Sequence, residues 1–326
     1  MRVLLVKTSS MGDVLHSLPA LTDAKHALPD IQFDWVVEEN FAQIPTWHNA
    51  VNHVIPVAIR RWRKNWFSAP IRAERAAFRA QLQATHYDAI IDAQGLLKSA
   101  FLVTRLAHGA KHGYDRHSIR EPLASLFYDH RYRVSKQQHA VERIRQLFAD
   151  SLHYKCPTQK GDYGIAQHFL CSTPEQQAPY LIFLHSTTRD DKHWPENHWR
   201  KLIALMAPTG LRIKLPWGTE HEHQRALRLA ECFDFVEVLP KLTLAQVAEQ
   251  IANAQAVVSV DTGLSHLTAA LDKTNFTLFG PTDPGLIGGY GQRQHEIKSI
   301  NNSMESITPT AVFEQLADKK IVLGNQ

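Results

Sequence analysis

Short apolar runs alternate with segments of helical periodicity along the whole chain. Buried parallel strands read as such near-continuous apolar runs, and the periodic segments between them suit crossover helices. The pattern therefore predicts an α/β protein built on doubly wound parallel sheets. In the first half we expect strands at 3–7, 33–37, 53–56 and 88–92, and a helix at 96–106. In the second half we expect strands at 180–185, 211–215, 236–239, 257–260 and 276–279, and helices at 199–206, 222–232 and 243–254.

Turn-forming residues interrupt the periodic pattern at 156–162, near the middle of the chain. A chain of 326 residues is also longer than one hydrophobic core comfortably serves. We therefore expect a first domain over 1–155 and a second over 162–310. For the remaining segment, 311–326, one option is that it crosses back onto the first domain.

The turn after the strand at 257–260 is the most informative segment. Asp261, Thr262 and Gly263 lead from that strand directly into a helix, and His266 adds a polar group. The first N–H groups of a helix lack intrahelical partners and its dipole favours negative charge, so this turn could hold a phosphate. The alternative is an ordinary strand-to-helix turn with Asp or Thr as the helix cap.

The N-terminus repeats this arrangement, since the run at 3–6 leads through a polar turn into a helical pattern at 14–21. Gly12 permits a close approach of the backbone, and Asp13 lies where a first-turn carboxylate is stabilised as the anion. Asp13 is therefore a candidate catalytic base or a helix cap. The repetition predicts two nucleotide-fold halves.

Other predicted strand ends in the second half also carry polar groups. The hydroxyls of Thr187 and Thr188 and the cation of Lys192 suit phosphate oxygens, the alternative for Lys192 being a surface lysine. Glu222 could bind ribose hydroxyls or be a first-turn helix acid. The glycine-rich loop at 280–291 could close over a ligand or simply connect. Because parallel strands end at one edge of a sheet, these groups are expected to converge.

The net charge of +4 is too small to indicate a nucleic-acid binder, so the placement of the cations matters more. Residues 60–67, Arg-Arg-Trp-Arg-Lys-Asn-Trp-Phe, interleave cations with aromatic rings. Such a segment suits substrate carboxylates and phosphates, an anionic membrane face or single-stranded nucleic acid, or it is a solvated helix face. Further cations between 111 and 136 favour a polyanionic substrate.

Several common chemistries lack their signatures. The 19 histidines include no HExxH helix, and His221 and His223 are two residues apart, so they do not share a helix face. No P-loop, GxGxxG or GxSxG motif occurs. What remains is the handling of a diphosphate without a metal.

The cysteine content and the hydropathy of the chain indicate its cellular compartment. Cys156, Cys171 and Cys232 form no CxxC pair and are too few for a disulfide framework. No apolar run approaches the roughly 20 residues that span a bilayer, and no apolar leader precedes the first strand. We expect a protein of the reducing cytosol.

Six segments together resemble the lipopolysaccharide heptosyltransferases of glycosyltransferase family 9, and within them the branch that adds the first heptose. The resemblance runs from about residue 1 to 290 and is weak beyond that. Its segments are Lys-Thr-Ser-Ser-Met-Gly-Asp-Val-Leu-His at 7–16, Arg-Arg-Trp-Arg-Lys at 60–64, Lys-His-Trp-Pro at 192–195, Lys-Leu-Pro-Trp-Gly at 214–218, Ser-Val-Asp-Thr-Gly-Leu-Ser-His at 259–266 and Gly-Pro-Thr-Asp-Pro at 280–284.

The resemblance implies a GT-B fold, in which two Rossmann-like domains face a central cleft. It implies inverting transfer of L-glycero-D-manno-heptose from ADP-heptose to the inner Kdo of Kdo2-lipid A, with the first domain binding acceptor and the second binding donor. Asp13 matches the family's base. No cofactor, metal or nucleic-acid partner is implied, and the protein is expected to be peripheral on the cytoplasmic face of the inner membrane.

Carried over residue by residue, the resemblance also implies the binding residues. Leu242 departs from the family member with methionine at that position, although leucine keeps an apolar wall for adenine. The implied donor-binding residues are Thr187, Thr188, Lys192, Glu222, Leu242, Asp261, Thr262, Gly263 and His266. The implied acceptor-binding residues are Arg60, Arg61, Arg63, Lys64 and Arg120, of which the cluster at 60–64 could instead contact the membrane.

Three alternatives to this function stay open. A related heptosyltransferase with a different acceptor would share the donor chemistry. A nucleotide-sensing or nucleic-acid-binding module would bind ADP or an oligonucleotide without turnover. A nucleotide-sugar epimerase on a similar fold would convert the donor without any acceptor.

Overall fold

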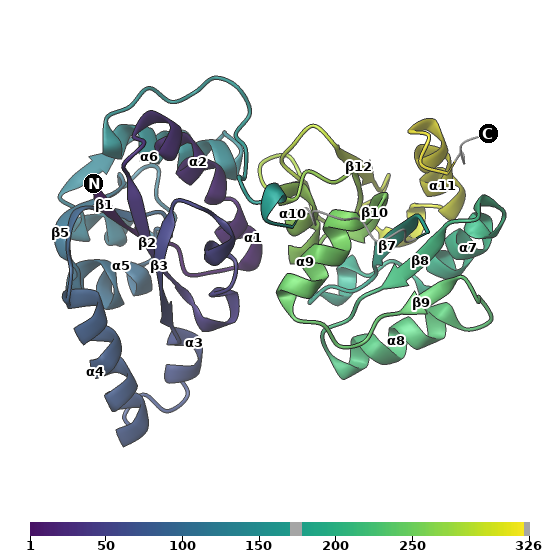
Figure 1. Cartoon of the computed structure of the whole chain (residues 1–326), viewed down its shortest axis with the longest axis horizontal. Coiled ribbons are helices and arrows are strands. Elements are labelled where there is room, and N and C mark those ends of the chain that lie inside the picture. Colours follow the sequence, from purple (N-terminus) through teal and green to yellow (C-terminus); the bar gives the residue numbers. More distant parts are fainter. Residues whose placement is uncertain (170–177, 323–326) are drawn as a thin grey trace. The chain divides into compact units, whose positions relative to one another are not determined.

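The computed structural model describes residues 1–169 and 178–322, so Cys171 lies outside the described residues. The chain divides into two compact units, Met1–Gly164 and Ile165–Gln326. Each unit is built on its own six-stranded sheet, in which all paired strands are parallel (Figure 1). The α/β class expected from the apolar runs is confirmed.

The first sheet has the strand order of dinucleotide-binding folds, β3-β2-β1-β4-β5-β6. The order reverses between β1 and β4, and in such sheets ligands bind beyond the carboxyl ends of the strands at that point. The strands are β1 (Arg2–Val6), β2 (Gln32–Glu38), β3 (Val51–Val57), β4 (His86–Asp92), β5 (His108–Tyr114) and β6 (His130–Tyr132).

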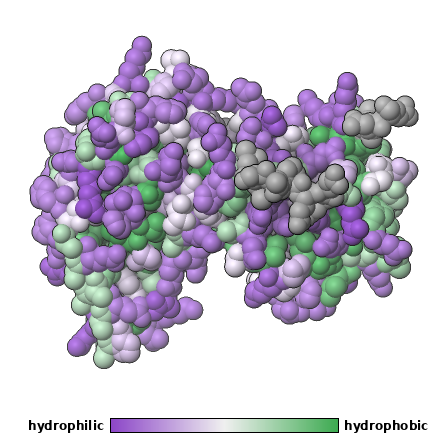
Figure 2. All heavy atoms as spheres, viewed as in Figure 1, coloured by the Kyte–Doolittle hydropathy of each residue, from purple (hydrophilic) through white to green (hydrophobic). Residues whose placement is uncertain are grey.

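Helix α4 (Ala69–Gln83) packs on one face of this sheet because its buried side chains share a core with alternate residues of β1. Phe78 and Leu82 of the helix belong to one apolar cluster with Leu4 and Val6. In Figure 2, pale green side chains run along the position of this alanine-rich helix. The other helices of the unit are α1 (Met11–Leu15), α2 (Leu18–Ala27), α3 (Ile59–Trp62), α5 (Leu97–Leu102) and α6 (Ala140–Leu152).

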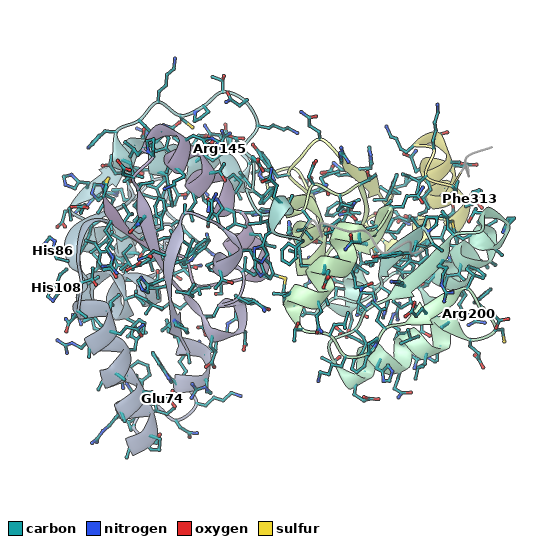
Figure 3. The ribbon with its side chains drawn as sticks, viewed as in Figure 1. Glu74, His86, His108, Arg145, Arg200 and Phe313 are labelled. Atoms are coloured by element: carbon teal, nitrogen blue, oxygen red, sulfur yellow. The ribbon has the colours of Figure 1, made fainter. Side chains whose placement is uncertain are left out.

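Helices α2 and α6 pack together, and α6 contacts β4, β5 and β6. The ring of Phe148 on α6 lies 5.8 Å from the ring of Phe33 on β2. Arg145, labelled in Figure 3, is 1% exposed and pairs with Asp23 of α2 at 2.6 Å. A buried cation needs such a partner, so this pair fixes α6 against α2.

The second sheet repeats the order of the first. It runs β12-β11-β10-β7-β8-β9, which is the same order when counted from β7, and its reversal falls between β7 and β10. The two nucleotide-fold halves predicted from the repeated strand-to-helix turns therefore exist as two equivalent sheets. The strands are β7 (Tyr180–Leu184), β8 (Arg212–Leu215), β9 (Val236–Val238), β10 (Ala256–Val260), β11 (Asn275–Phe279) and β12 (Gln294–Lys298).

The C-terminal helix belongs to the core of the second unit. Val312 and Leu316 of α11 (Pro309–Asp318) are fully buried in one cluster with Trp199 and Ile203 of α7 (Glu196–Met206). The apolar side chains of α11 thus pack against α7. The remaining helices are α8 (Glu220–Ala230), α9 (Leu244–Asn253) and α10 (Gly263–Ala270).

Strands β5, β6 and β12 were not among those predicted from the sequence. The β5 segment, His-Gly-Ala-Lys-His-Gly-Tyr, is not an apolar run, and its glycines serve close packing instead. A Cβ on Gly109, whose φ is +144°, would lie 2.2 Å from the carbonyl oxygen of Tyr87. The helix expected at 96–106 ends at Leu102, followed by a 3-10 turn, η3 (Thr104–Leu106).

A buried histidine in the first unit makes stability depend on pH. The Nδ1 atom of His48 accepts a hydrogen bond from the Ala50 N–H at 3.1 Å, and its Nε2 lies 2.9 Å from the Thr22 hydroxyl. Burial lowers the pKa of His48 to about 4. The unfolded chain binds a proton near pH 6.5 that the native state excludes, so stability is lost as pH falls from about 6.5 toward 4.

We expect the free energy of unfolding of the wild-type protein to fall by about 2 kcal/mol more than that of His48→Gln between pH 7 and pH 5. Urea denaturation at the two pH values measures this difference. The variant keeps the other buried histidines, so their contributions cancel in the comparison. Equal losses in both proteins would show that His48 is not the group responsible.

Candidate active site

The carboxyl edge of the first sheet carries the candidates of the first unit. Asp13 follows β1, the cluster at 60–64 follows β3, and Arg120 follows β5. All strands of this sheet are parallel, so these segments leave it at the same edge.

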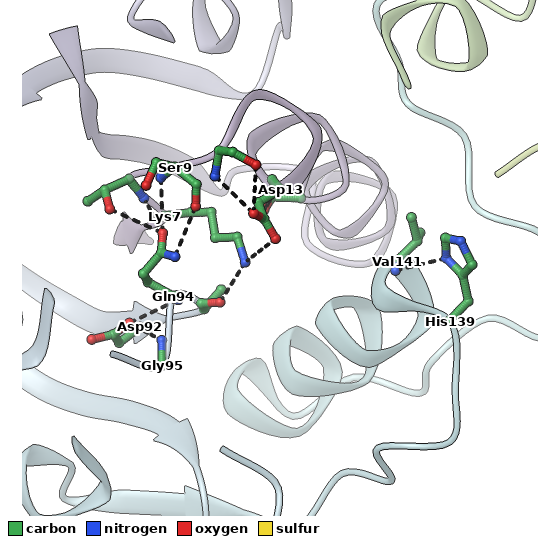
Figure 4. A network of polar contacts seen from close by, with 12 residues as sticks. Lys7, Ser9, Asp13, Asp92, Gln94, Gly95, His139 and Val141 are labelled. Atoms are coloured by element: carbon green, nitrogen blue, oxygen red, sulfur yellow. Dashed lines mark hydrogen bonds and ion pairs between the residues drawn. The ribbon is translucent and has the colours of Figure 1, made fainter. Parts of the chain in front are cut away.

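Asp13 occupies the first turn of α1 with its carboxylate held in one orientation. Its Oδ2 accepts hydrogen bonds from the N–H of Ser10 at 2.9 Å and from the Ser10 hydroxyl at 3.0 Å (Figure 4). Asp13 is therefore the third residue of a capping box whose N-cap is Ser10, which matches the capping role that was one of the two expected for it. Its side chain is still 46% exposed, which leaves the carboxylate accessible to a substrate hydroxyl.

A buried cation lies beside this carboxylate. The Nζ of Lys7 is 3.7 Å from Oδ1 of Asp13 and donates a hydrogen bond to the carbonyl of Ala93 at 3.0 Å (Figure 4). Burial lowers the pKa of Lys7, and the charges of Asp13 and Asp92 oppose that shift. Lys7 thus links the turn after β1 to the turn after β4.

Gln94 fixes the same turn through its side-chain amide. Its Oε1 accepts hydrogen bonds from the N–H groups of Thr8 at 2.7 Å and Ser9 at 3.1 Å, and its Nε2 donates to the Ser9 carbonyl at 2.9 Å. Asp92 holds the turn of Gln94, accepting from the N–H groups of Gln94 at 3.0 Å and Gly95 at 3.1 Å (Figure 4). The sequence analysis assigned Lys7, Gln94 and Asp92 no role, although the strand-to-helix turn at 93–95 was the available signal.

We expect Gln94→Met to lower kcat by about tenfold, because two N–H groups of the Asp13 turn lose their acceptor and the carboxylate loses its fixed position. Steady-state turnover measures this loss. Gln94→Glu is the matched control, since it keeps an acceptor for both N–H groups and should lose less. Equal losses in the two variants would contradict a positioning role.

The basic cluster is exposed, but its members differ in their partners. The guanidinium of Arg61 pairs with Glu39 at 3.0 Å and with Glu74 at 2.8 Å. Glu74 lies on α4 (Figure 3) and also accepts a hydrogen bond from the Trp62 ring N–H at 2.8 Å. Arg61 therefore braces α3 against α4, whereas Arg60, Arg63 and Lys64 keep exposed side chains.

In the second unit, the loops after β7 and β10 are joined by an ion pair. The Nζ of Lys192 lies 2.6 Å from Oδ2 of Asp261, and each side chain is 16% exposed. The Thr187 hydroxyl donates to the Asp261 carbonyl at 3.0 Å. The structure thus brings three predicted donor residues together at the point where the strand order reverses, with Thr188 exposed beside them.

The start of α10 lies at the same point. Thr262 is the N-cap in an extended conformation, and Gly263 is the first helical residue. The first N–H groups of this helix point away from it toward the end of β10, where the helix dipole favours an anion. His266 is half-buried in the first turn of the helix.

Two further predicted residues follow β8 and β9. The Oε2 of Glu222 accepts hydrogen bonds from the N–H groups of Gly218 at 2.7 Å and Thr219 at 2.9 Å, so Glu222 caps α8. This is the alternative that the sequence analysis kept for Glu222. Leu242 is half-buried in the loop between β9 and α9.

The described residues contain neither a metal-binding cluster nor a membrane-spanning helix. Across 1–169 and 178–322, no group of three or more His, Cys, Asp and Glu side chains is arranged to hold a metal ion. Over the same ranges no helix combines the length and the apolar character needed to cross a membrane.

The family model for glycosyltransferase family 9 (heptosyltransferase) matches residues 75–317. The chain belongs to glycosyltransferase family 9. This confirms the resemblance stated from the six segments. The chain is accordingly a heptosyltransferase of this family. Its two Rossmann-like sheets correspond to the GT-B type of fold.

Members of family 9 with assigned names match over nearly the full chain. Lipopolysaccharide heptosyltransferase 1 of Escherichia coli K12 is 66% identical, over 97% of this chain and 99% of the relative. The solved structure of E. coli heptosyltransferase WaaC with ADP superimposes with a TM-score of 0.96 at 66% identity, covering 98% of this chain and 99% of that one. The WaaC structure with ADP-2-deoxy-2-fluoro heptose gives a TM-score of 0.94 at 64% identity, covering 98% and 100%.

Proposed function

We propose that this family 9 chain transfers L-glycero-D-manno-heptose from ADP-heptose to the inner Kdo of Kdo2-lipid A, with inversion at the anomeric carbon. The observation that carries the proposal is the Lys192–Asp261 pair. It holds an ammonium group beside the start of α10, where the second sheet reverses its strand order and a phosphate can bind. The similarity to E. coli WaaC, solved with ADP and with an ADP-heptose analogue, supports the choice of donor.

The donor is held along the carboxyl edge of the second sheet. Lys192 and the first N–H groups of α10, from Gly263 onward, bind the diphosphate, with Thr187 and Thr188 as further donors. Leu242 lies beyond β9, two strands from β7, which corresponds to roughly 10 Å at the usual strand spacing. That span suits the separation of a diphosphate from its adenine, so Leu242 forms an apolar wall for the base.

Asp261, Thr262, Glu222 and His266 complete the donor site in this proposal. Asp261 orients the Lys192 ammonium through their ion pair. Glu222 is engaged as the cap of α8, so its contact with ribose hydroxyls uses a carboxylate that the helix start already orients.

The transfer needs one base and one stabilised leaving group. Asp13 accepts the proton of the acceptor hydroxyl while the oxygen forms a bond to the anomeric carbon of heptose. The bond between that carbon and the β-phosphate oxygen breaks, and ADP leaves with the electron pair. Lys192 and the start of α10 stabilise the charge that develops on the diphosphate. Attack opposite the leaving group gives inversion.

The acceptor is bound by the cations of the first unit. Arg60, Arg63, Lys64 and Arg120 pair with Kdo carboxylates and lipid A phosphates. Arg61 also lies in this cluster, but two glutamates already occupy its guanidinium. We therefore assign it a weaker contact with the acceptor.

We expect the double variant Arg60→Gln/Arg63→Gln to raise the KM for deacylated Kdo2-lipid A by roughly tenfold, because two charge-assisted contacts are lost. Arg61→Gln should raise it less. Initial rates at varied acceptor concentration measure both values. An unchanged KM for the double variant would mean that these cations contact the membrane surface and not the acceptor.

The function is tested by ADP release from ADP-L-glycero-D-manno-heptose in the presence of EDTA, with and without deacylated Kdo2-lipid A. Acceptor-dependent release is expected. Release without acceptor would indicate hydrolysis or a different reaction of the donor, and no release in either case would point to a nucleotide-binding module or another acceptor.

The lipid character of this acceptor places the reaction at a membrane. We propose that the protein acts as a peripheral protein on the cytoplasmic face of the inner membrane, where the lipid-linked acceptor is presented.

A further inference from the structure

Apolar side chains cluster on the surface of two neighbouring elements of the first unit, α5 and the 3-10 helix η4 (Pro122–Phe127). Leu97 and Phe101 on α5 are 37% and 46% exposed, and Leu123 and Leu126 on η4 are 62% and 68% exposed. We call these four residues, with Phe127, the α5–η4 patch. Contiguous exposed apolar surface of this kind marks a site of interaction.

The two elements form one continuous surface. The rings of Phe101 and Phe127 lie edge to face with their centroids 6.1 Å apart. The N–H of Leu97 donates to the Glu121 carboxylate at 2.6 Å, which ties the start of α5 to the start of η4. The exposed side chains are therefore held on a fixed frame.

Two cations lie at the patch itself, and further cations lie close to it in the sequence. The guanidinium of Arg105 lies 3.9 Å from the centroid of the Phe101 ring, and Lys98 is part of α5 itself. Between residues 97 and 133 the chain has seven Lys and Arg residues and three Asp and Glu residues. Arg116, Arg120, Arg131 and Arg133 in this stretch are exposed.

This combination favours an anionic lipid surface as the occupant. Leucine and phenylalanine enter the boundary between headgroups and acyl chains, while arginine and lysine around them contact lipid phosphates. A second copy of the chain would bring like charges together. The core of a protein interface is also depleted of charge, whereas here a guanidinium lies directly over an aromatic ring of the patch.

The place of the patch in the fold agrees with this occupant. Helix α5 begins shortly after Gln94, the residue that holds the Asp13 turn, and η4 follows β5. The patch therefore lies at the carboxyl edge of the first sheet, together with the Asp13 turn. Docking through it would bring a lipid-linked acceptor to that edge.

We propose that the α5–η4 patch is the surface through which the first unit docks on an anionic phospholipid bilayer, with Leu123 and Leu126 entering the interface. The inference rests on the proposed peripheral location of the protein. It assigns a surface separate from the cluster at 60–64, where Arg61 is already paired and Phe67 is the one large apolar side chain that is exposed.

Sedimentation with vesicles of phosphatidylglycerol and phosphatidylethanolamine, free of any acceptor, tests the proposal. We expect wild-type protein to bind more as the phosphatidylglycerol fraction rises and less as salt is added. The double variant Leu123→Ser/Leu126→Ser should bind roughly tenfold more weakly or worse, because two apolar side chains no longer enter the interface. Its transfer rate to deacylated, soluble acceptor should match the wild type.

Two control variants separate the outcomes. Ile300→Ser removes a fully exposed apolar side chain from the second unit, and Phe67→Ser removes one beside the basic cluster. Both should bind vesicles as the wild type does. Loss of binding in Phe67→Ser alone would overturn the assignment to the α5–η4 patch, and so would equal losses in all three variants.

Wild-type protein that fails to bind anionic vesicles would overturn both the patch and the peripheral location. It would leave the transferase proposal intact if the soluble acceptor is still glycosylated. Normal vesicle binding without transfer to the soluble acceptor would instead count against the proposed reaction alone.

Discussion

Turnover of Asp13→Asn is expected to fall by roughly 100-fold or more, with ADP binding nearly unchanged. Asparagine has the shape of aspartate and still offers an oxygen to the Ser10 N–H, so the first turn of α1 stays capped. It lacks the basic oxygen that accepts the proton of the acceptor hydroxyl in the proposed mechanism. Single-turnover transfer to deacylated acceptor and calorimetry with ADP measure the two quantities.

Ser10→Ala is the matched control for Asp13→Asn. It removes the hydroxyl that donates to the Asp13 carboxylate at 3.0 Å and keeps the carboxylate itself. We expect a loss of only a few-fold, since the Ser10 N–H still orients the side chain. A loss as large as that of Asp13→Asn would assign the effect to the turn rather than to proton transfer, and equal loss of binding and turnover in Asp13→Asn would contradict the base role.

Lys192→Met should lower kcat/KM for ADP-heptose by roughly 100-fold to 1,000-fold. The ammonium is held beside the start of α10 by its ion pair with Asp261, and removing it also leaves the Asp261 carboxylate facing the diphosphate. Repulsion then adds to the lost attraction. Initial rates at varied donor concentration, together with the Kd for ADP, separate the ground-state contribution from the one made in the transition state.

Asp261→Asn breaks the same ion pair but keeps the cation. We expect it to lose much less activity than Lys192→Met, because the lysine can still reach the diphosphate. Comparable losses in both variants would mean that the pair matters for the shape of the loops after β7 and β10, and Lys192 would no longer be assigned to the leaving group.

The fold was predictable where the strands are apolar. All five strands expected in the second half exist, and β1 to β4 exist in the first, because buried parallel strands need apolar residues on both faces. Strand β5 could not be found this way, because it consists largely of glycine and histidine. Its glycines allow neighbouring atoms to approach the strand closely. Gly113 shows this, because a Cβ there would lie 2.3 Å from the ring of Tyr128.

The candidate sites were predictable to the level of strand ends. Because parallel strands share an edge, polar residues after β7 and β10 had to converge, and the Lys192–Asp261 pair shows that they do. Sequence could not tell that Arg61 is paired with Glu39 and Glu74, since those partners come from distant turns. It also could not give Gln94 its role, because the amide's partners lie some 85 positions earlier in the chain.

Each sheet draws its core from its own half of the chain. The cluster on the α4 face runs from Leu4 to Ala107, and the cluster around Trp199 runs from Leu181 to Val322. Each of these two clusters is therefore built within one unit. With acceptor binding in the first unit and donor binding in the second, as proposed above, such modular construction lets the two preferences evolve independently. Hybrids that combine a first unit and a second unit from different family 9 enzymes are then a direct route to new glycosidic linkages.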